Sequence, residues 1–148
     1  MQQTSRNGKG SGAFHVQTNA APNEVITFRR ADDGSLDLIG SVATGGDGDG
    51  TPHLTSQGSV ALTRDGQYLL VTNAASDALS VFSVAADGSI ELRERVHTGA
   101  APRSVDERDG LVVVLNTGEP GLTGPPARLP LRALPPTASP SPRAAHSS

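Results

Sequence analysis

Short apolar runs alternate with polar turns along most of the chain. Seven runs of about six residues are rich in β-branched or apolar side chains and mostly bounded by Gly, Asn, Asp or Pro: AFHVQTN, EVITFRR, GSVALTR, QYLLVTN, LSVFSV, IELRERV and LVVVLN. Asp-Gly turns, a strong hairpin signal, separate consecutive runs in ADDGSL and AADGSI. Apolar residues at helical spacing are not sustained over about ten residues anywhere. The pattern predicts an all-β fold, mostly an antiparallel meander.

Part of this pattern is repeated. Residues 15–46 align without a gap over residues 69–100, and 13 of these 32 positions are identical. The matches include Thr18 with Thr72, Asn19 with Asn73, and Phe28 with Phe82. A third copy starts at LVVVLN, where Asn116 lies 43 residues after Asn73. A period in the forties with four short strands is typical of a β-propeller, although other periodic all-β folds remain alternatives.

The repeats predict a layout of blades. GSVALTR, QYLLVTN, LSVFSV and IELRERV would run from the innermost to the outermost strand of one complete blade. The preceding copy lacks its innermost strand, and the following copy has an inner strand near RSVDER and a second at LVVVLN. Residues 12–124 are therefore predicted to form about two and a half four-stranded blades, after a polar leader at 1–11. A strand from the far end of the chain would fill the gap in the first blade, and strand edges left exposed would favour self-association.

The strand pattern stops at Pro125. Residues 125–148 hold seven prolines, three arginines and no acidic residue. Proline has no N–H for a β-ladder, so the segment is predicted to be a disordered tail. Two origins remain open. One is translation in a shifted reading frame after Gly124, in keeping with the 11 Arg to one Lys expected of a high-GC gene. The other is a natural Pro-rich tail.

Composition excludes several classes of function. The chain has no cysteine, which excludes disulfides, thiolate metal sites and a thiol nucleophile. Its formal net charge is −3 and its basic residues are not clustered, so no nucleic-acid partner is predicted. The longest aliphatic run, LVVVL, is too short to span a membrane. The first residues are polar and carry no secretory pattern, so a cytoplasmic location is expected.

The segments TNAAPNEVITFRRADDGSL and SQGSVALTRDGQYLLVTNAASDALSVFSVAADGSI resemble the lactonase-type seven-bladed propellers, which include 6-phosphogluconolactonase and carboxymuconate cyclase relatives and share a Tyr-Val-Thr-Asn type of repeat. The resemblance implies a parent protein that hydrolyses or forms a sugar or muconate lactone, and so binds a lactone or sugar acid without a cofactor. Family members are more than twice as long, and their acid/base residues lie mostly in the middle blades. No catalytic residue is therefore assigned, and this chain is expected to be inactive alone. A non-catalytic scaffold that binds a protein or small ligand is the alternative.

Three residues are candidates for substrate binding. His53 and Gln57 belong to the Gly-rich segment 45–58, which lacks the Lys of a phosphate loop and the Glu of a calcium loop and is predicted to link two blades. Loops at a propeller mouth line the ligand site, which makes both residues candidates. Arg103, at the entry to the third blade, could hold a carboxylate or phosphate through its guanidinium, or could be an ordinary surface arginine.

The other polar residues are assigned structural roles. Of the remaining histidines, His15 and His97 fall on strands and His146 in the tail, so no metal site is predicted. The recurring asparagines, Asn19, Asn73 and Asn116, are predicted to be turn-formers that bond their own backbone.

Overall fold

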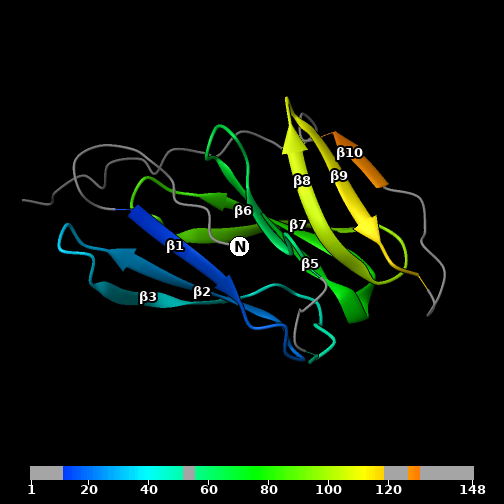
Figure 1. Ribbon diagram of the computed structural model, residues 1–148, viewed down its shortest axis with the longest axis horizontal. Helices are drawn as coiled ribbons and strands as arrows, with labels where there is room; N and C mark the ends of the chain where they lie inside the picture. Colours follow the sequence, from blue (N-terminus) through cyan, green and yellow to red (C-terminus); the bar gives the residue numbers. More distant parts are fainter. Residues whose placement is uncertain (1–11, 52–55, 119–126, 131–148) are drawn as a thin grey trace, which may run out of the picture.

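The computed structural model describes residues 12–51, 56–118 and 127–130, which form three antiparallel sheets arranged side by side (Figure 1). Blade 1 contains β1 (Gly12–Gln17), β2 (Glu24–Arg30) and β3 (Leu36–Ala43). Blade 2 contains β4 (Val60–Leu62), β5 (Tyr68–Asn73), β6 (Ala78–Val84) and β7 (Ile90–His97), with the 3₁₀ turn η1 (Ala74–Ser76) after β5. Blade 3 contains β8 (Pro102–Arg108), β9 (Leu111–Asn116) and β10 (Ala127–Pro130).

The strand order confirms the predicted all-β layout. Blade 2 has four strands in the order β4-β5-β6-β7, each paired with its neighbour in the sequence. Among the described residues, blade 1 has three strands in the order β1-β2-β3. Blade 3 begins with the two predicted strands, β8 and β9. The alternation of apolar runs and turns therefore predicted the order of the strands correctly.

The two Asp-Gly turns have the same geometry. Oδ1 of Asp33 accepts hydrogen bonds from the backbone N–H (2.9 Å) and the hydroxyl (2.6 Å) of Ser35, and Asp87 does the same with Ser89 at the same two distances. Gly88 has φ +86, and a Cβ on it would lie 2.4 Å from the Cβ of Ala13. The second turn therefore requires glycine for its conformation and for its close approach to β1 of blade 1.

Two apolar cores lie between the blades. Between blades 1 and 2, Val25, Leu69, Val71 and Phe82 are buried, and Val42, Val60, Leu62, Val84 and Ile90 pack around them. Between blades 2 and 3, the buried residues are Ala61, Leu70, Leu79, Val81, Val105, Val112 and Val114. Neighbouring blades thus present apolar sheet faces to each other. Burial of these faces stabilises the packing of one blade on the next.

One segment of the tail that was expected to be disordered forms a β-strand instead. Ala127–Pro130 forms β10, which pairs antiparallel with β9 from Ala127 opposite Val114 to Pro130 opposite Leu111. β10 is the last strand of its sheet as described, and an edge strand tolerates proline because one side of it needs no ladder partner. The predicted boundary at Pro125 and residues 131–148 lie outside the described residues, as does the leader at 1–11, so disorder there stays a prediction.

Candidate functional site

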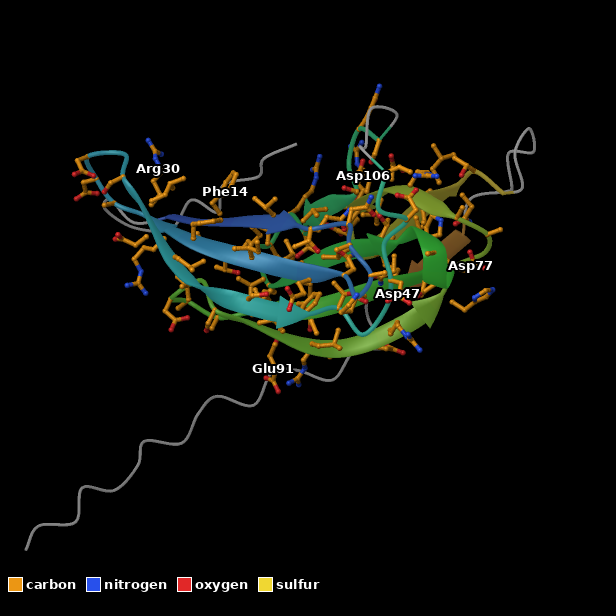
Figure 2. The ribbon with its side chains drawn as sticks, turned by 90° about the horizontal axis from the view of Figure 1, so that it is seen from below. Phe14, Arg30, Asp47, Asp77, Glu91 and Asp106 are labelled. Carbon is orange, nitrogen blue, oxygen red and sulfur yellow. The ribbon has the colours of Figure 1, made fainter. Side chains whose placement is uncertain are left out.

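The loops that carry the candidate residues share one end of the sheets. In blades 1 and 2, β1, β3, β5 and β7 all end there, because neighbouring strands within each sheet are antiparallel. In blade 3, β8 begins there. Figure 2 shows Asp47 and Asp77 at this end and Arg30 at the other. We call this end the rim, formed in the described residues by loops 18–23, 44–51, 74–77 and 98–101.

At the rim, Arg103 forms an ion pair with Asp49. Arg103 follows Pro102 in β8, where the pairing with β9 shifts between Pro102 and Ser104. A bulge of this kind bends the strand and redirects a side chain. Nη1 of Arg103 contacts Oδ2 of Asp49, and the two side chains are only 23% and 19% exposed. The pair therefore connects blade 3 to the loop that leaves blade 1.

Asp49 is held by further hydrogen bonds. Its Oδ1 accepts from Nδ2 of Asn19 (2.7 Å), from the backbone N–H of Thr51 (3.0 Å) and from the hydroxyl of Thr51 (2.8 Å). Burial alone would raise the pKa of Asp49, but the hydrogen bonds from Asn19 and Thr51 and the charge of Arg103 outweigh it and lower the pKa well below its usual range. A carboxylate with such a low pKa is a poor general base at neutral pH.

The three predicted binding residues differ in where they lie and in what they contact. Arg103 lies at the rim, but its guanidinium is engaged by Asp49. Gln57 is exposed and lines a hollow of about 280 Å³ between the innermost strands of blades 2 and 3. The neighbouring Ser56 donates its hydroxyl to the carbonyl oxygen of Arg103 (2.6 Å), so this linker does run alongside β8. His53 lies outside the described residues, and its role stays a prediction.

The prediction for the recurring asparagines is wrong at Asn73. Its side chain is fully buried and bonds the side chains of Thr44, Asn23 and Ser80 rather than the backbone of its own turn. Oδ1 of Asn73 accepts from the hydroxyl of Thr44 (2.7 Å) and from Nδ2 of Asn23 (3.0 Å), both of blade 1. Its Nδ2 donates to the hydroxyl of Ser80 (2.8 Å), which in turn donates to the carbonyl oxygen of Thr44 (2.7 Å). Asn73 therefore fastens blade 2 to blade 1.

The other two asparagines also bond across loops or blades. Asn19 has the left-handed conformation of a turn residue (φ 54), but its Nδ2 donates to Asp49 and to the carbonyl oxygen of Thr51 (2.8 Å). Nδ2 of Asn116 donates to the carbonyl oxygen of Thr98 (2.8 Å), so it links blade 3 to blade 2. The repeated Thr and Asn positions are thus architectural, as expected, but through contacts between repeats rather than within a turn.

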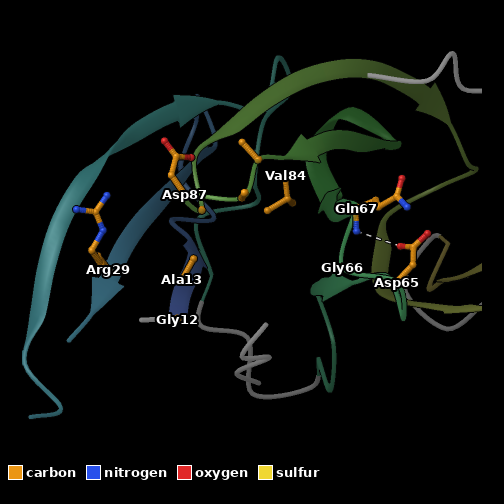
Figure 3. A pocket seen from close by; sticks show the side chains of 11 residues that line it. Gly12, Ala13, Arg29, Asp65, Gly66, Gln67, Val84 and Asp87 are labelled. Carbon is orange, nitrogen blue, oxygen red and sulfur yellow. Dashed lines mark hydrogen bonds between the residues drawn. The ribbon is translucent and has the colours of Figure 1, made fainter. Parts of the chain in front are cut away.

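A larger hollow of about 580 Å³ lies at the opposite end of the sheets, between blades 1 and 2 (Figure 3). Its two acidic side chains close hairpin turns: Asp65 accepts from the backbone N–H of Gln67 (3.0 Å), and Asp87 accepts from Ser89. The hydrogen bonds from Ser89, and to a lesser extent the charge of Arg29, lower the pKa of Asp87. Both carboxylates in this hollow are therefore engaged in hydrogen bonds within their own turns.

The strand histidines lie apart from one another. His97 is exposed on β7, whereas His15 is 8% exposed on β1, with its Nδ1 3.0 Å from the hydroxyl oxygen of Thr27. Within the part of the chain that the structure describes, no three His, Asp or Glu side chains are grouped as metal ligands would be. His146 lies outside the described residues.

Burial gives His15 a pH-dependent effect on stability. Desolvation lowers its pKa below 6.5, so the folded chain resists a proton that the unfolded chain accepts. The free energy of unfolding should therefore be highest above pH 6.5 and fall below it, by at most about 1.4 kcal/mol per pH unit for one proton. Urea denaturation between pH 8 and 5 measures this. His15→Gln should remove the decrease due to this residue and His97→Gln should keep it; equal profiles for wild type and His15→Gln would contradict the assignment.

The arrangement defines a class of protein. Successive antiparallel sheets, each packed face to face with the next, with every inner strand reached from the outer strand of the preceding blade, are the architecture of a β-propeller. No helix in the described part of the chain is long and apolar enough to cross a membrane.

Comparison with known proteins identifies the family. Residues 10–119 match the family model described as "Lactonase, 7-bladed beta-propeller". The chain belongs to this family, which confirms the resemblance of its repeats. No curated protein matches the sequence.

Solved structures of similar fold come from three bacteria. A periplasmic gluconolactonase of Pseudomonas aeruginosa is 20% identical with a TM-score of 0.58, over 88% of this chain and 39% of that one. A protein from Lactobacillus plantarum is 24% identical with a TM-score of 0.56, over 74% and 32%. A candidate 6-phosphogluconolactonase of Bacteroides fragilis is 21% identical with a TM-score of 0.51, over 82% and 36%. The chain thus spans about a third of the length of these structures.

Proposed function

We propose that these blades belong to a propeller that acts on a lactone of a sugar acid or a muconate, and that this chain does not hydrolyse lactones by itself. Membership of the lactonase family supports the first part. The names of two similar structures, a gluconolactonase and a candidate 6-phosphogluconolactonase, favour a sugar lactone as the substrate.

The ion pair between Arg103 and Asp49 supports the second part. Lactone hydrolysis needs a base that activates water and donors that stabilise the developing oxyanion. Arg103 could bind a carboxylate or phosphate, but Asp49 already neutralises its guanidinium, and the low pKa of Asp49 makes it a poor base. The adjacent hollow of about 280 Å³ lies at the small end of the range of ligand pockets, which is roughly 300–1,000 Å³.

An assay of the purified full chain tests its inactivity. Glucono-δ-lactone, 6-phosphogluconolactone and muconolactone should hydrolyse at the rate measured in buffer alone, with a known lactonase as the positive control. Asp49→Asn, which frees Arg103, should bring binding of gluconate or 6-phosphogluconate without turnover, and Arg103→Ala should show neither. Turnover by the wild-type chain that Arg103→Ala abolishes would contradict the proposal.

A chimera tests the proposed activity of the parent propeller. Residues 12–118 would replace the aligned segment of an active lactonase propeller, and thermal unfolding would verify that the product folds. We expect the folded chimera to hydrolyse the lactone. A folded chimera that binds a protein or small ligand but leaves lactones intact would instead support a non-catalytic scaffold.

A further inference from the structure

The hollow of about 580 Å³ at the end opposite the rim has the size of a small-molecule site, for which the range is roughly 300–1,000 Å³. Its walls are the start of β1 and the end of β2 in blade 1, and the β4–β5 and β6–β7 turns in blade 2. Blades 1 and 2 pack on each other through a shared apolar core. The hollow therefore belongs to a contact between neighbouring blades that is present in this chain.

Arg29 supplies the positive charge of this hollow and is free to bind a ligand. Its side chain is exposed, and within the described part of the chain it forms no hydrogen bond or ion pair. The repeat aligns Arg29 with Ser83 of blade 2, which is buried and donates its hydroxyl to the carbonyl oxygen of Glu91 (3.5 Å). Arg29 is therefore not a repeated architectural residue, and its guanidinium keeps the planar set of donors that suits a carboxylate.

Each of the two carboxylates in the hollow uses only one oxygen in its turn. Oδ1 of Asp87 accepts from Ser89, and Oδ1 of Asp65 accepts from the backbone N–H of Gln67 and from the hydroxyl of Thr63 (2.7 Å). Within the described residues no hydrogen bond reaches Oδ2 of either carboxylate. Both aspartates thus keep an acceptor for a ligand without giving up the turn.

The charged groups lie on two sides of the hollow (Figure 3). Arg29 and Asp87 lie on one side, close enough for the charge of Arg29 to act on the carboxyl group of Asp87, and Asp65 lies on the other side. Val84 and Ala13 lie between them. One arginine and two aspartates among the lining residues give the hollow a net charge of −1.

We propose that this hollow binds a basic α-amino acid such as lysine or ornithine. The α-carboxylate would accept hydrogen bonds from the guanidinium of Arg29, and the α-ammonium would donate to Oδ2 of Asp87. The side-chain ammonium would donate to Oδ2 of Asp65 on the other side, with the alkyl chain lying over Val84. The net charge of such a ligand complements that of the hollow. This site is separate from the rim and does not depend on lactone chemistry.

NMR titration of the ¹⁵N-labelled full chain with lysine tests the proposal. We expect saturable shifts of the amide signals of Ala85 and Gly88 with a Kd of about 1 mM, whereas the signal of Gly46 at the rim should stay in place. Norleucine lacks the side-chain ammonium, Nα-acetyllysine lacks the α-ammonium, and cadaverine lacks the carboxylate. Each should bind at least about tenfold more weakly than lysine, because each leaves one charged group of the hollow without its partner.

Substitutions at the three charged residues assign the contacts separately. Asp65→Asn should weaken lysine binding at least about tenfold but leave norleucine binding unchanged, because norleucine has no group for Asp65 to accept from. Arg29→Gln and Asp87→Asn should weaken the binding of both amino acids. Asparagine can accept the same hydrogen bonds through its Oδ1, so both aspartate variants should keep their turns and the melting behaviour of the chain.

Two matched variants serve as controls. Asp33→Asn changes the equivalent turn of blade 1, and Arg30→Gln changes the residue next to Arg29; neither residue lines the hollow, so both variants should bind lysine as the wild type does. The proposal would be overturned if lysine gave no saturable shift up to about 20 mM, if norleucine bound as tightly as lysine, or if Asp33→Asn lost as much affinity as Asp87→Asn.

Discussion

Phe82→Ala should lower the free energy of unfolding by about 3–5 kcal/mol, the range for deleting a buried phenylalanine ring. Phe82 is fully buried between blades 1 and 2, where it packs with Val25, Leu69 and Val71. Its side chain belongs to blade 2 while Val25 belongs to blade 1, so the cavity would weaken both a sheet and the contact between sheets. Urea denaturation followed by circular dichroism gives the loss from the shift of the midpoint at constant slope.

Phe28→Ala is the matched control for this substitution. Phe28 has the same position in the repeat and also lies opposite a leucine, but it lies on the face of blade 1 that is turned away from blade 2 and is only partly buried. Its loss should be about 1 kcal/mol, consistent with the partly exposed aromatic pair that it forms with Phe14. Equal losses for the two variants would contradict the assignment of Phe82 to a face covered by blade 1 and of Phe28 to a face that blade 2 does not cover.

The strands were predictable because their signals are local. Alternating apolar residues and Asp-Gly turns depend on neighbours in the sequence, and the same turn geometry at Asp33 and Asp87 shows that such signals suffice for hairpins. β10 could not be foreseen in this way. It pairs with β9 through its backbone, and an edge strand needs neither alternation nor a full set of N–H donors.

The asparagines show that an ungapped alignment of the repeats can pair residues that are not structurally equivalent. The alignment places Asn19 over Asn73 and Val25 over Leu79. In the structure, however, Val25 pairs with Gln17 and Leu79 pairs with Thr72, so the connection in blade 1 is one residue longer than that in blade 2. Asn19 is consequently carried beyond the strand end to Asp49, whereas Asn73 stays in the strand and is buried. A single extra residue thus gives two identical motifs different partners.

The candidate site was predictable only in part for a related reason. The position of Arg103 at the entry to blade 3 follows from the repeat, and the structure does place it at the rim. Its pairing with Asp49 depends on the bulge after Pro102 and on the path of a Gly-rich loop, which no periodic signal encodes. In the sequence, Asp49 is distinguished only by its place in that Gly-rich loop.

Asn73→Leu should lower the free energy of unfolding by about 2–4 kcal/mol, because it removes a buried amide while keeping a similar side-chain volume. Asn73 also fills a confined site: a Cβ on Gly46 would lie 2.8 Å from its Cγ. Without the amide, Thr44 can still donate to the carbonyl oxygen of Asn23 (3.1 Å), which limits the loss. The hydroxyl oxygen of Ser80, by contrast, loses the hydrogen bond that Nδ2 of Asn73 donates to it.

A double-mutant cycle with Ser80→Ala shows whether Asn73 acts as a fastener between blades. Asn73 and Ser80 share one network with the carbonyl oxygen of Thr44, so the double variant should lose less stability than the sum of the single variants, by about 0.5–3 kcal/mol. Exchange of the Thr44 amide, which bonds the carbonyl oxygen of Asn23, should quicken in each variant more than exchange in the β8–β9 hairpin. If the losses of stability are additive, and amide exchange quickens equally at Thr44 and in the β8–β9 hairpin, then Asn73 stabilises its own blade alone.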